Sequence, residues 1–210
     1  MRIETFELPP IGTNAYLLTD DDRKEAILID APQMAWERVS GVLDGSGINL
    51  VAVLLTHGHF DHVMGASAFN RQGTPVYAHA DDREMMSKLK EQVAMFGIPT
   101  AVDEPQIDHW FDTSKPLELL GRSIDIRHTP GHCPGNVTLV FPEEKAAFVG
   151  DVIFAGGIGR TDLPGGSFPV LERSIKEQIY TLPPETTIFP GHGPTSTVDH
   201  ERLNNPFVLV

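Results

Sequence analysis

Four side chains that can ligate a metal fall within six residues of one short segment. The segment Thr56–His62 reads Thr-His-Gly-His-Phe-Asp-His and contains His57, His59, Asp61 and His62. Neutral imidazole and carboxylate groups together suit zinc, iron or manganese better than calcium or magnesium. The segment therefore predicts a site for a divalent metal of the first transition row.

This segment follows a short apolar run, Leu50–Leu55, which has the length and the β-branched content of a buried strand. The metal-capable side chains are therefore expected where a strand ends and a loop begins, a usual place for chemistry in an α/β protein. The alternative is a polar loop that is rich in histidine by chance. Three histidines and one aspartate in so short a stretch argue against it.

Three further residues recur in the same setting, each at the end of an expected strand and beside a glycine. His132 ends a Thr-Pro-Gly-His run, Asp151 ends Phe-Val-Gly-Asp, and His192 lies in Phe-Pro-Gly-His-Gly. Glycine permits a tight turn and leaves room for the backbone to approach a metal or a substrate. Seven ligands are too many for one tetrahedral ion and suit two ions about 3.5–4 Å apart that share a carboxylate.

Strands and helices are expected along the whole chain. Apolar or alternating runs divided by turns predict strands over 1–8, 14–18, 26–30, 50–55, 75–79, 117–120, 123–128, 136–141, 146–149 and 187–189. Helical spacing predicts helices over 34–43, from 65 to 72, over 81–96 and over 171–182. Residues 97–112 are expected to form an irregular surface connection. The pattern predicts an α/β (α+β) chain of two sheets covered by helices, with the loops at one edge.

The composition limits the class of protein. The 210 residues fit a single domain over 1–210, and a hydrophobic content of 40% with a charged content of 21% is ordinary for a globular protein. The net charge of −13 argues against a nucleic-acid partner or an anionic membrane, since both require a basic face. A single cysteine, with neither a signal segment nor a run of transmembrane length, leads us to expect a cytoplasmic location.

The His-x-His-x-Asp-His run, followed by Thr-Pro-Gly-His, Gly-Asp and Pro-Gly-His-Gly, resembles the metallo-β-lactamase superfamily. Within it, the chain is most similar to the glyoxalase II-like (hydroxyacylglutathione hydrolase-like) enzymes. Residues 156–166 and the ending Asn205–Phe207 resemble the short bacterial members of that branch. The resemblance covers nearly the whole chain and implies a four-layer αββα sandwich, with two mixed β-sheets flanked by helices.

The resemblance also implies a role for each metal-capable residue. By the resemblance, the first metal is held by His57, His59 and His132. The second metal is held by Asp61, His62 and His192. Asp151 bridges the two metals. The cofactors implied are two divalent metal ions, with zinc foremost and iron or manganese as alternatives. Asp61 is expected to be catalytic by orienting a bridging hydroxide. Arg160 is expected to meet an anionic substrate, and tying down its own loop is its alternative role.

These roles predict a metal-dependent hydrolase for a small-molecule thioester or ester, such as an S-lactoylglutathione-like hydroxyacyl thioester. The nucleophile would be a hydroxide that bridges the two metals. Cys133 lacks the activating base that a nucleophilic thiolate needs. The longer glyoxalase II enzymes bind glutathione through a C-terminal helical region, whereas 18 residues follow His192 here. Glutathione recognition therefore cannot be carried over residue by residue.

Three other functions stay open on the sequence. A persulfide dioxygenase-like oxidoreductase would use one iron within part of the same ligand set: His57, His59, His132 and Asp151. A lactonase or another small-ester hydrolase would keep the whole set. A non-enzymatic metal-binding module has little support, because a complete ligand set beside so many glycines is unusual for structure alone. The ligand types do not fix the metal, and the sequence gives no oligomeric state.

Overall fold

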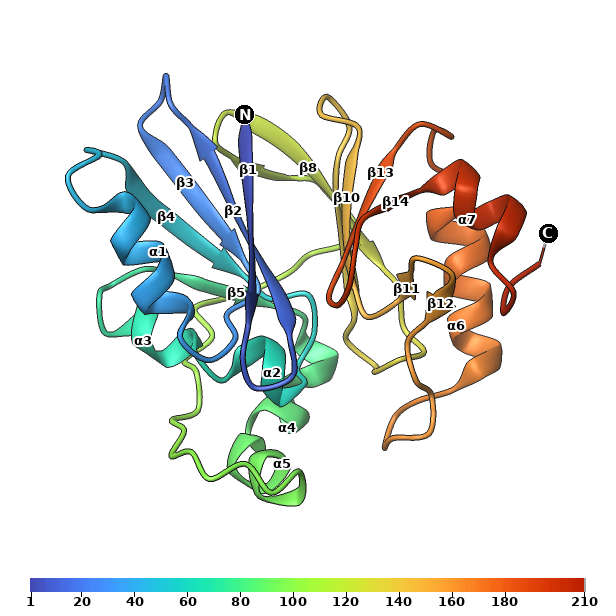
Figure 1. Cartoon of the computed structure of the whole chain (residues 1–210), viewed down its shortest axis with the longest axis horizontal. Helices are drawn as coiled ribbons and strands as arrows, with labels where there is room; N and C mark the ends of the chain where they lie inside the picture. Colours follow the sequence, from blue (N-terminus) through green and yellow to red (C-terminus); the bar gives the residue numbers. More distant parts are fainter. Residues whose placement is uncertain (210) are drawn as a thin grey trace. The chain divides into compact units, whose positions relative to one another are not determined.

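The structure, a computed structural model, describes residues 1–209 and divides into two compact units, Met1–Phe111 and Asp112 onward. Each unit contains a six-stranded mixed sheet with helices packed on it (Figure 1). The division does not test the single domain expected over 1–210, which stays a prediction. Every helix within residues 1–209 falls short of the length and apolarity that a membrane span requires.

The sheet of the first unit has the order β1-β2-β3-β4-β5-β6. Its strands are Arg2–Leu8 (β1), Thr13–Asp20 (β2), Glu25–Ile29 (β3), Asn49–Leu54 (β4), Val76–Ala78 (β5) and His109–Trp110 (β6). β1, β2 and β3 pair antiparallel, whereas β3, β4, β5 and β6 pair in parallel. Since parallel strands place their carboxyl ends at one edge of a sheet, the segments after β3, β4 and β5 are neighbours.

Alternate strand residues of this sheet form a core with the helices. The helical elements are Ala35–Leu43 (α1), Phe60–Val63 (α2), Ala66–Asn70 (α3), Ala80–Asp82 (η1), Arg83–Met86 (α4) and Leu89–Met95 (α5). Leu17, Leu28 and Val53 belong to one buried cluster with Val39 of α1 and Phe69 of α3. Burial of each large apolar side chain is worth about 1.5–3 kcal/mol. The period-two alternation therefore fixes which face of each strand meets the helices.

The sheet of the second unit has the order β14-β13-β10-β9-β8-β7. Its strands are Leu117–Leu119 (β7), Arg122–His128 (β8), Val137–Phe141 (β9), Ala146–Gly150 (β10), Thr187–Pro190 (β13) and Ser196–Thr197 (β14), and a separate hairpin joins Ile153–Phe154 (β11) and Gly157–Ile158 (β12). Among the described residues of this sheet, only β10 and β13 pair in parallel. The segments that follow these two strands therefore leave the sheet at the same edge.

Helices cover one face of this second sheet. They are Phe168–Ser174 (α6), the π-helical turn Ile175–Ile179 (η2) that continues it, and Val198–Asn204 (α7), drawn in orange and red in Figure 1. Val149, Leu171 and Ile188 lie in their shared core. The Tyr180 hydroxyl donates to the carbonyls of Glu201 and Val208 at 3.1 and 3.2 Å, and burial raises the pKa of this phenol to about 12.

The predicted fold class, two mixed sheets flanked by helices, is confirmed. Three local predictions need correction. The helix expected over 81–96 is broken at Ser87 and Lys88, and residues 97–112 include β6. The helix expected from 171 starts at Phe168, because Pro169 is well suited to a first helical turn. β14 and α7 were not predicted.

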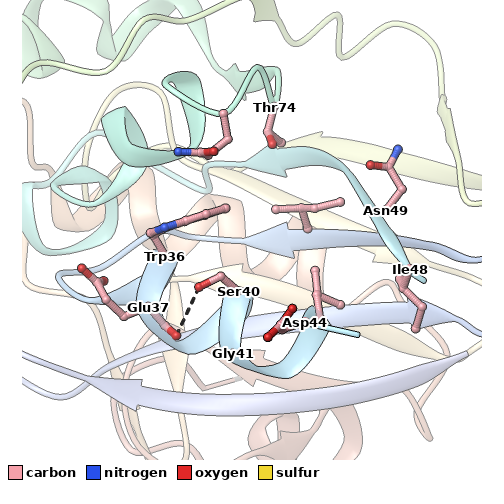
Figure 2. A pocket seen from close by; sticks show the side chains of 11 residues that line it. Trp36, Glu37, Ser40, Gly41, Asp44, Ile48, Asn49 and Thr74 are labelled. Atoms are coloured by element: carbon pink, nitrogen blue, oxygen red, sulfur yellow. Dashed lines mark hydrogen bonds between the residues drawn. The ribbon is translucent and has the colours of Figure 1, made fainter. Parts of the chain in front are cut away.

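A groove of about 470 Å³ opens on the first unit between α1 and the start of β4. Figure 2 shows Trp36, Glu37 and Ser40 from α1 facing Asn49 and Thr74 across it. Asn49 begins β4, whereas the predicted metal ligands follow the end of that strand. None of the predicted site residues lines the groove, so it is separate from the candidate metal centre.

Candidate metal centre

The first cluster of metal-capable side chains lies in the segment between β4 and α2. His57, His59, Asp61 and His62 are all buried, with exposed fractions of 2%, 9%, 4% and 0%. The ring centroid of His57 lies 4.9 Å from that of His59 and 4.0 Å from that of His62. The structure therefore brings together the three histidines that the sequence placed in this loop.

Side chains that follow the neighbouring strands β3 and β5 hold the backbone of this loop. The Thr56 amide donates to Asp30 Oδ1 at 2.7 Å, and the Gly58 amide donates to Asp82 Oδ2 at 2.8 Å. Gly58 also lies too close to its neighbours for a side chain. A Cβ atom there would stand 2.9 Å from Asp82 Cβ and 3.1 Å from Met86 Cγ. The glycine between the two histidines is thus required by packing.

The Asp30 carboxylate also orients two of the histidine rings. Its Oδ2 accepts from His62 Nδ1 at 2.7 Å and from the Thr56 hydroxyl at 2.8 Å. That hydroxyl oxygen lies 3.1 Å from His57 Nδ1. Because the hydroxyl donates to Asp30, it accepts a hydrogen bond from Nδ1–H of His57. With the proton on Nδ1 in both rings, Nε2 is the atom available to ligate a metal. Asp30 has φ of +59°, a backbone conformation that aspartate tolerates better than most residues.

Asp61 is fixed by a residue at the start of β2. The Thr13 hydroxyl donates to Asp61 Oδ2 at 2.6 Å, and both side chains are buried. The same carboxylate oxygen lies 3.3 Å from His62 Nε2. Asp61 and His62 thus present one oxygen and one nitrogen at a spacing that suits two ligands of the same metal ion.

The second cluster lies in the second unit, at the ends of three strands. His132 follows β8, Asp151 follows β10, and His192 follows β13. Nε2 of His132 and Nε2 of His192 each lie 3.6 Å from the same atom, Asp151 Oδ2. The backbone supports this convergence, because the Gly191 amide donates to the Gly150 carbonyl at 2.8 Å. One carboxylate oxygen therefore faces two imidazole nitrogens.

The loop after Asp151 orients His132. Nδ1 of His132 donates to the Arg160 carbonyl at 2.8 Å, which again leaves Nε2 as the atom available to ligate a metal. Gly159 lets this loop approach, since a Cβ atom there would stand 1.8 Å from the Asp151 carbonyl oxygen. The buried Glu201 carboxylate of α7 accepts from the Gly156 amide at 3.0 Å and so anchors the preceding hairpin.

The Arg160 guanidinium forms a forked ion pair with Asp162. Nε and Nη2 donate to the two carboxylate oxygens at 2.8 and 2.7 Å. This pairing lowers the pKa of Asp162 from 3.8 to about 2. The contact matches the alternative role that the sequence suggested, an arginine that ties down its own loop. Contact of Arg160 with a substrate stays a prediction.

Sequence reasoning did not assign the residues that orient these ligands. Asp30 was identified only as the end of a strand, because it lacks the neighbouring glycine that marks Asp151. Thr13 and Asp82 carry no local signal, because each reaches the ligand loop from a distant part of the sequence. Cys133, beside His132, is a buried free cysteine.

The donor set suits a transition metal. It contains imidazole nitrogens and carboxylate oxygens, and three of the imidazoles have Nδ1 committed to a hydrogen-bond acceptor: His57, His62 and His132. That pattern is typical of histidines that ligate through Nε2. Seven histidine and aspartate side chains in the two clusters each offer an atom suitable for a metal. The set resembles the ligands of zinc, iron or manganese sites.

Comparison with known proteins gives the family. The family model described as the metallo-beta-lactamase superfamily matches residues 8–192. A hydroxyacylglutathione hydrolase of Haemophilus influenzae, GloC, is 37% identical over 211 residues, which cover 99% of this chain and 98% of the relative. The chain therefore belongs to the metallo-β-lactamase superfamily.

Two solved structures match the chain over almost its whole length. The crystal structure of BLEG-1, a B3 metallo-β-lactamase, has a TM-score of 0.89 at 37% identity and covers 99% of both chains. The structure of TTHA1623 in a di-iron-bound form has a TM-score of 0.86 at 33% identity, covering 98% of this chain and all of the other. With its histidine and aspartate clusters, the chain is a metallohydrolase of this superfamily.

Replacing Asp30 tests its role in orienting the ligands. We expect Asp30→Asn to keep the backbone conformation but to lose one acceptor, so that metal affinity falls about 10–100-fold. Competition titration with a chromophoric chelator measures this. Asp44→Ala, which changes an exposed carboxylate beside the separate groove, is the control and should bind metal like the wild type. Equal affinities for the Asn variant and the wild type would contradict the role.

The Arg160–Asp162 pair gives a prediction about pH. Because the guanidinium lowers the pKa of Asp162 to about 2, the ion pair is complete above pH 4 and is lost as the pH falls toward 2. In Arg160→Ala the pKa of Asp162 should return toward 3.8. Carbon-detected NMR of the carboxyl resonances measures both values. An unchanged pKa in the variant would show that another group holds Asp162 ionised.

Proposed function

We propose that this chain hydrolyses a small-molecule thioester of the hydroxyacyl-glutathione class at a centre of two divalent metal ions. The ligands proposed for the two ions are those predicted from the sequence: His57, His59, Asp61, His62, His132, Asp151 and His192. One observation carries the proposal. Two imidazole nitrogens lie 3.6 Å from a single oxygen of Asp151, as expected for a carboxylate shared between two metals.

When bound, two divalent cations would lower the pKa of a shared water to about 7 and stabilise the oxyanion that forms at the substrate carbonyl. The chain's own residues prepare this chemistry. Asp30, Thr56 and the Arg160 carbonyl hold the imidazoles in one tautomer and one orientation. Thr13 holds Asp61, for which we propose the role of orienting the attacking water.

The proposed metals are zinc first, with iron or manganese as alternatives. The donor set lacks a thiolate, and sites of imidazole and carboxylate accept several ions according to their availability. The relative TTHA1623 was crystallised in a di-iron-bound form, which supports iron as a second choice. Cys133 is left out of the proposed donor set because its neighbour His132 already supplies the ligand at this strand end.

The thioester is proposed from the relative named a hydroxyacylglutathione hydrolase, which is 37% identical over nearly all of both chains. A β-lactam is the competing hydrolytic substrate, since BLEG-1 is equally similar and is described as a metallo-β-lactamase. Arg160 is proposed to meet an anionic part of the substrate, for which it would exchange one arm of its pairing with Asp162. A cytoplasmic location belongs to the same proposal.

Metal analysis followed by a substrate panel tests the proposal on one sample. We expect two metals per chain and hydrolysis of S-lactoylglutathione in preference to a lactone or a β-lactam. Asp151→Ala should lose one metal and, with several kcal/mol of transition-state stabilisation removed, more than about a hundredfold in kcat. Glu143→Ala, an exposed carboxylate in the turn between β9 and β10, is the matched control and should keep full activity.

Three results would contradict parts of the proposal in different ways. Unchanged turnover in Asp151→Ala would overturn the shared-carboxylate centre. Preference for a lactone or a β-lactam would keep the centre and replace the substrate. One iron per chain, together with oxygen uptake on a glutathione persulfide, would replace hydrolysis by the oxidoreductase alternative.

A further inference from the structure

One glutamine side chain bonds both peptide groups that flank His59. Gln92 of α5 accepts through Oε1 from the Phe60 amide at 3.1 Å. Its Nε2 donates to the Gly58 carbonyl at 3.2 Å. The Gly58 carbonyl belongs to the peptide before His59, and the Phe60 amide belongs to the peptide after it. A single side-chain amide thus contacts the backbone on each side of one proposed metal ligand.

Bonding both peptide groups fixes the direction of the His59 side chain. The two peptide planes determine φ and ψ of His59, which are −69° and 146°, an extended conformation outside the following helix. Gly58, His59 and Phe60 are all buried. Their polar backbone groups therefore need protein partners, since a buried amide or carbonyl left unsatisfied costs about 1–3 kcal/mol. Loss of the Gln92 side chain would allow these peptide groups to rotate and form hydrogen bonds with other groups.

We propose that Gln92 is a positioning residue for His59 and thereby controls the affinity of the metal that His59 ligates. The inference rests on the proposed function, because it takes His59 as a ligand. By that assignment His59 serves one metal of the two, together with His57 and His132. Substitution of Gln92 should therefore weaken one metal site and leave the second, built on Asp61 and His62, much less affected.

The position of Gln92 differs from that of the other residues that hold this loop. Asp30 and Asp82 are buried, with exposed fractions of 1% each, whereas Gln92 is half-buried on a short helix. The residue that caps the end of this helix makes a second contact, since the ring centroid of Phe96 lies 4.7 Å from that of Phe60, the first residue of α2. Through these two contacts, α5 acts on the residues that directly flank and follow His59.

A purely structural role for Gln92 makes a different prediction. Its Nε2 also donates to the Met85 carbonyl at 2.8 Å, which fastens the end of α4 to α5. If this contact were the only important one, substitution would lower thermal stability and leave the metal sites as they are. Measurements of the metal affinities and of the absorption spectrum of a bound metal therefore distinguish the positioning role from the purely structural role.

The experiment compares the full-length wild type with Gln92→Ala, Gln92→Glu and Glu91→Ala. The Glu variant keeps an acceptor for the Phe60 amide but cannot donate to the Gly58 carbonyl or the Met85 carbonyl. Glu91→Ala changes an exposed residue of the same helix and serves as the matched control. Each protein is stripped of metal and titrated with cobalt(II), and the visible absorption reports ligand geometry at each step.

We expect two cobalt sites in the wild type and in Glu91→Ala. In both Gln92 variants the affinity of one site should fall at least about tenfold and its absorption bands should change, while the other site stays within about threefold. Hydrogen exchange on the metal-free proteins is the second readout. Protection of the Phe60 amide should be lost in the Ala variant and retained in the Glu variant.

Each other outcome would contradict either the inference about Gln92 or the proposed function. Wild-type affinities and spectra in both Gln92 variants, with only a lower melting temperature, would overturn the positioning role. Equal weakening of both cobalt sites would overturn the assignment of Gln92 to one metal. Loss of one site with no thioester hydrolysis in the wild type would support the inference and refute the proposed substrate.

Discussion

The candidate metal centre depends on how the protein satisfies the backbone of one extended, buried loop. Residues 56–60 leave the sheet at the end of β4, so their amides lose the partners that a strand ladder would supply. Alternate amides instead donate to side chains from three different elements: Asp30 after β3, Asp82 in η1 and Gln92 in α5. Because extended backbone has a period of two, the intervening residues, His57 and His59, present their side chains together. The same hydrogen bonds that stabilise the loop therefore fix the direction of the two side chains that we propose as ligands.

The two units use a common arrangement to gather polar side chains. In each, parallel strands bring their carboxyl ends to one edge of a sheet, and an aspartate or a histidine lies within three residues of each strand end. The convergence of His132 and His192 on Asp151 follows from the parallel pairing of β10 with β13 and from the tight approach of the loop through Gly159. In both units the hydrogen bond at Nδ1 sets the tautomer, so orientation and basicity of the imidazoles are determined before any metal binds.

The sequence alone predicted the strands that carry the proposed ligands, because buried strands are continuous apolar runs that end in glycine or a polar residue. It also proposed the ligands, since their types and strand-end positions are local features, and their role stays a prediction. It did not predict Gln92 or Asp82 as partners of the loop, because their contacts join segments that are 24 to 34 residues apart and leave no periodic signal. The short elements β6 and α7 were missed for a related reason. Two residues of β6 pair only because β5 is already in place, and α7 is stabilised by its packing against the core.

We propose that the two clusters supply ligands to one shared pair of metals. Anomalous diffraction at the absorption edge of the bound metal, on crystals of the metal-loaded protein, tests this proposal. We expect two anomalous peaks about 3.5–4 Å apart, each coordinated by residues of both clusters and joined by Asp151. A single peak, or peaks whose ligands all come from one cluster, would contradict it.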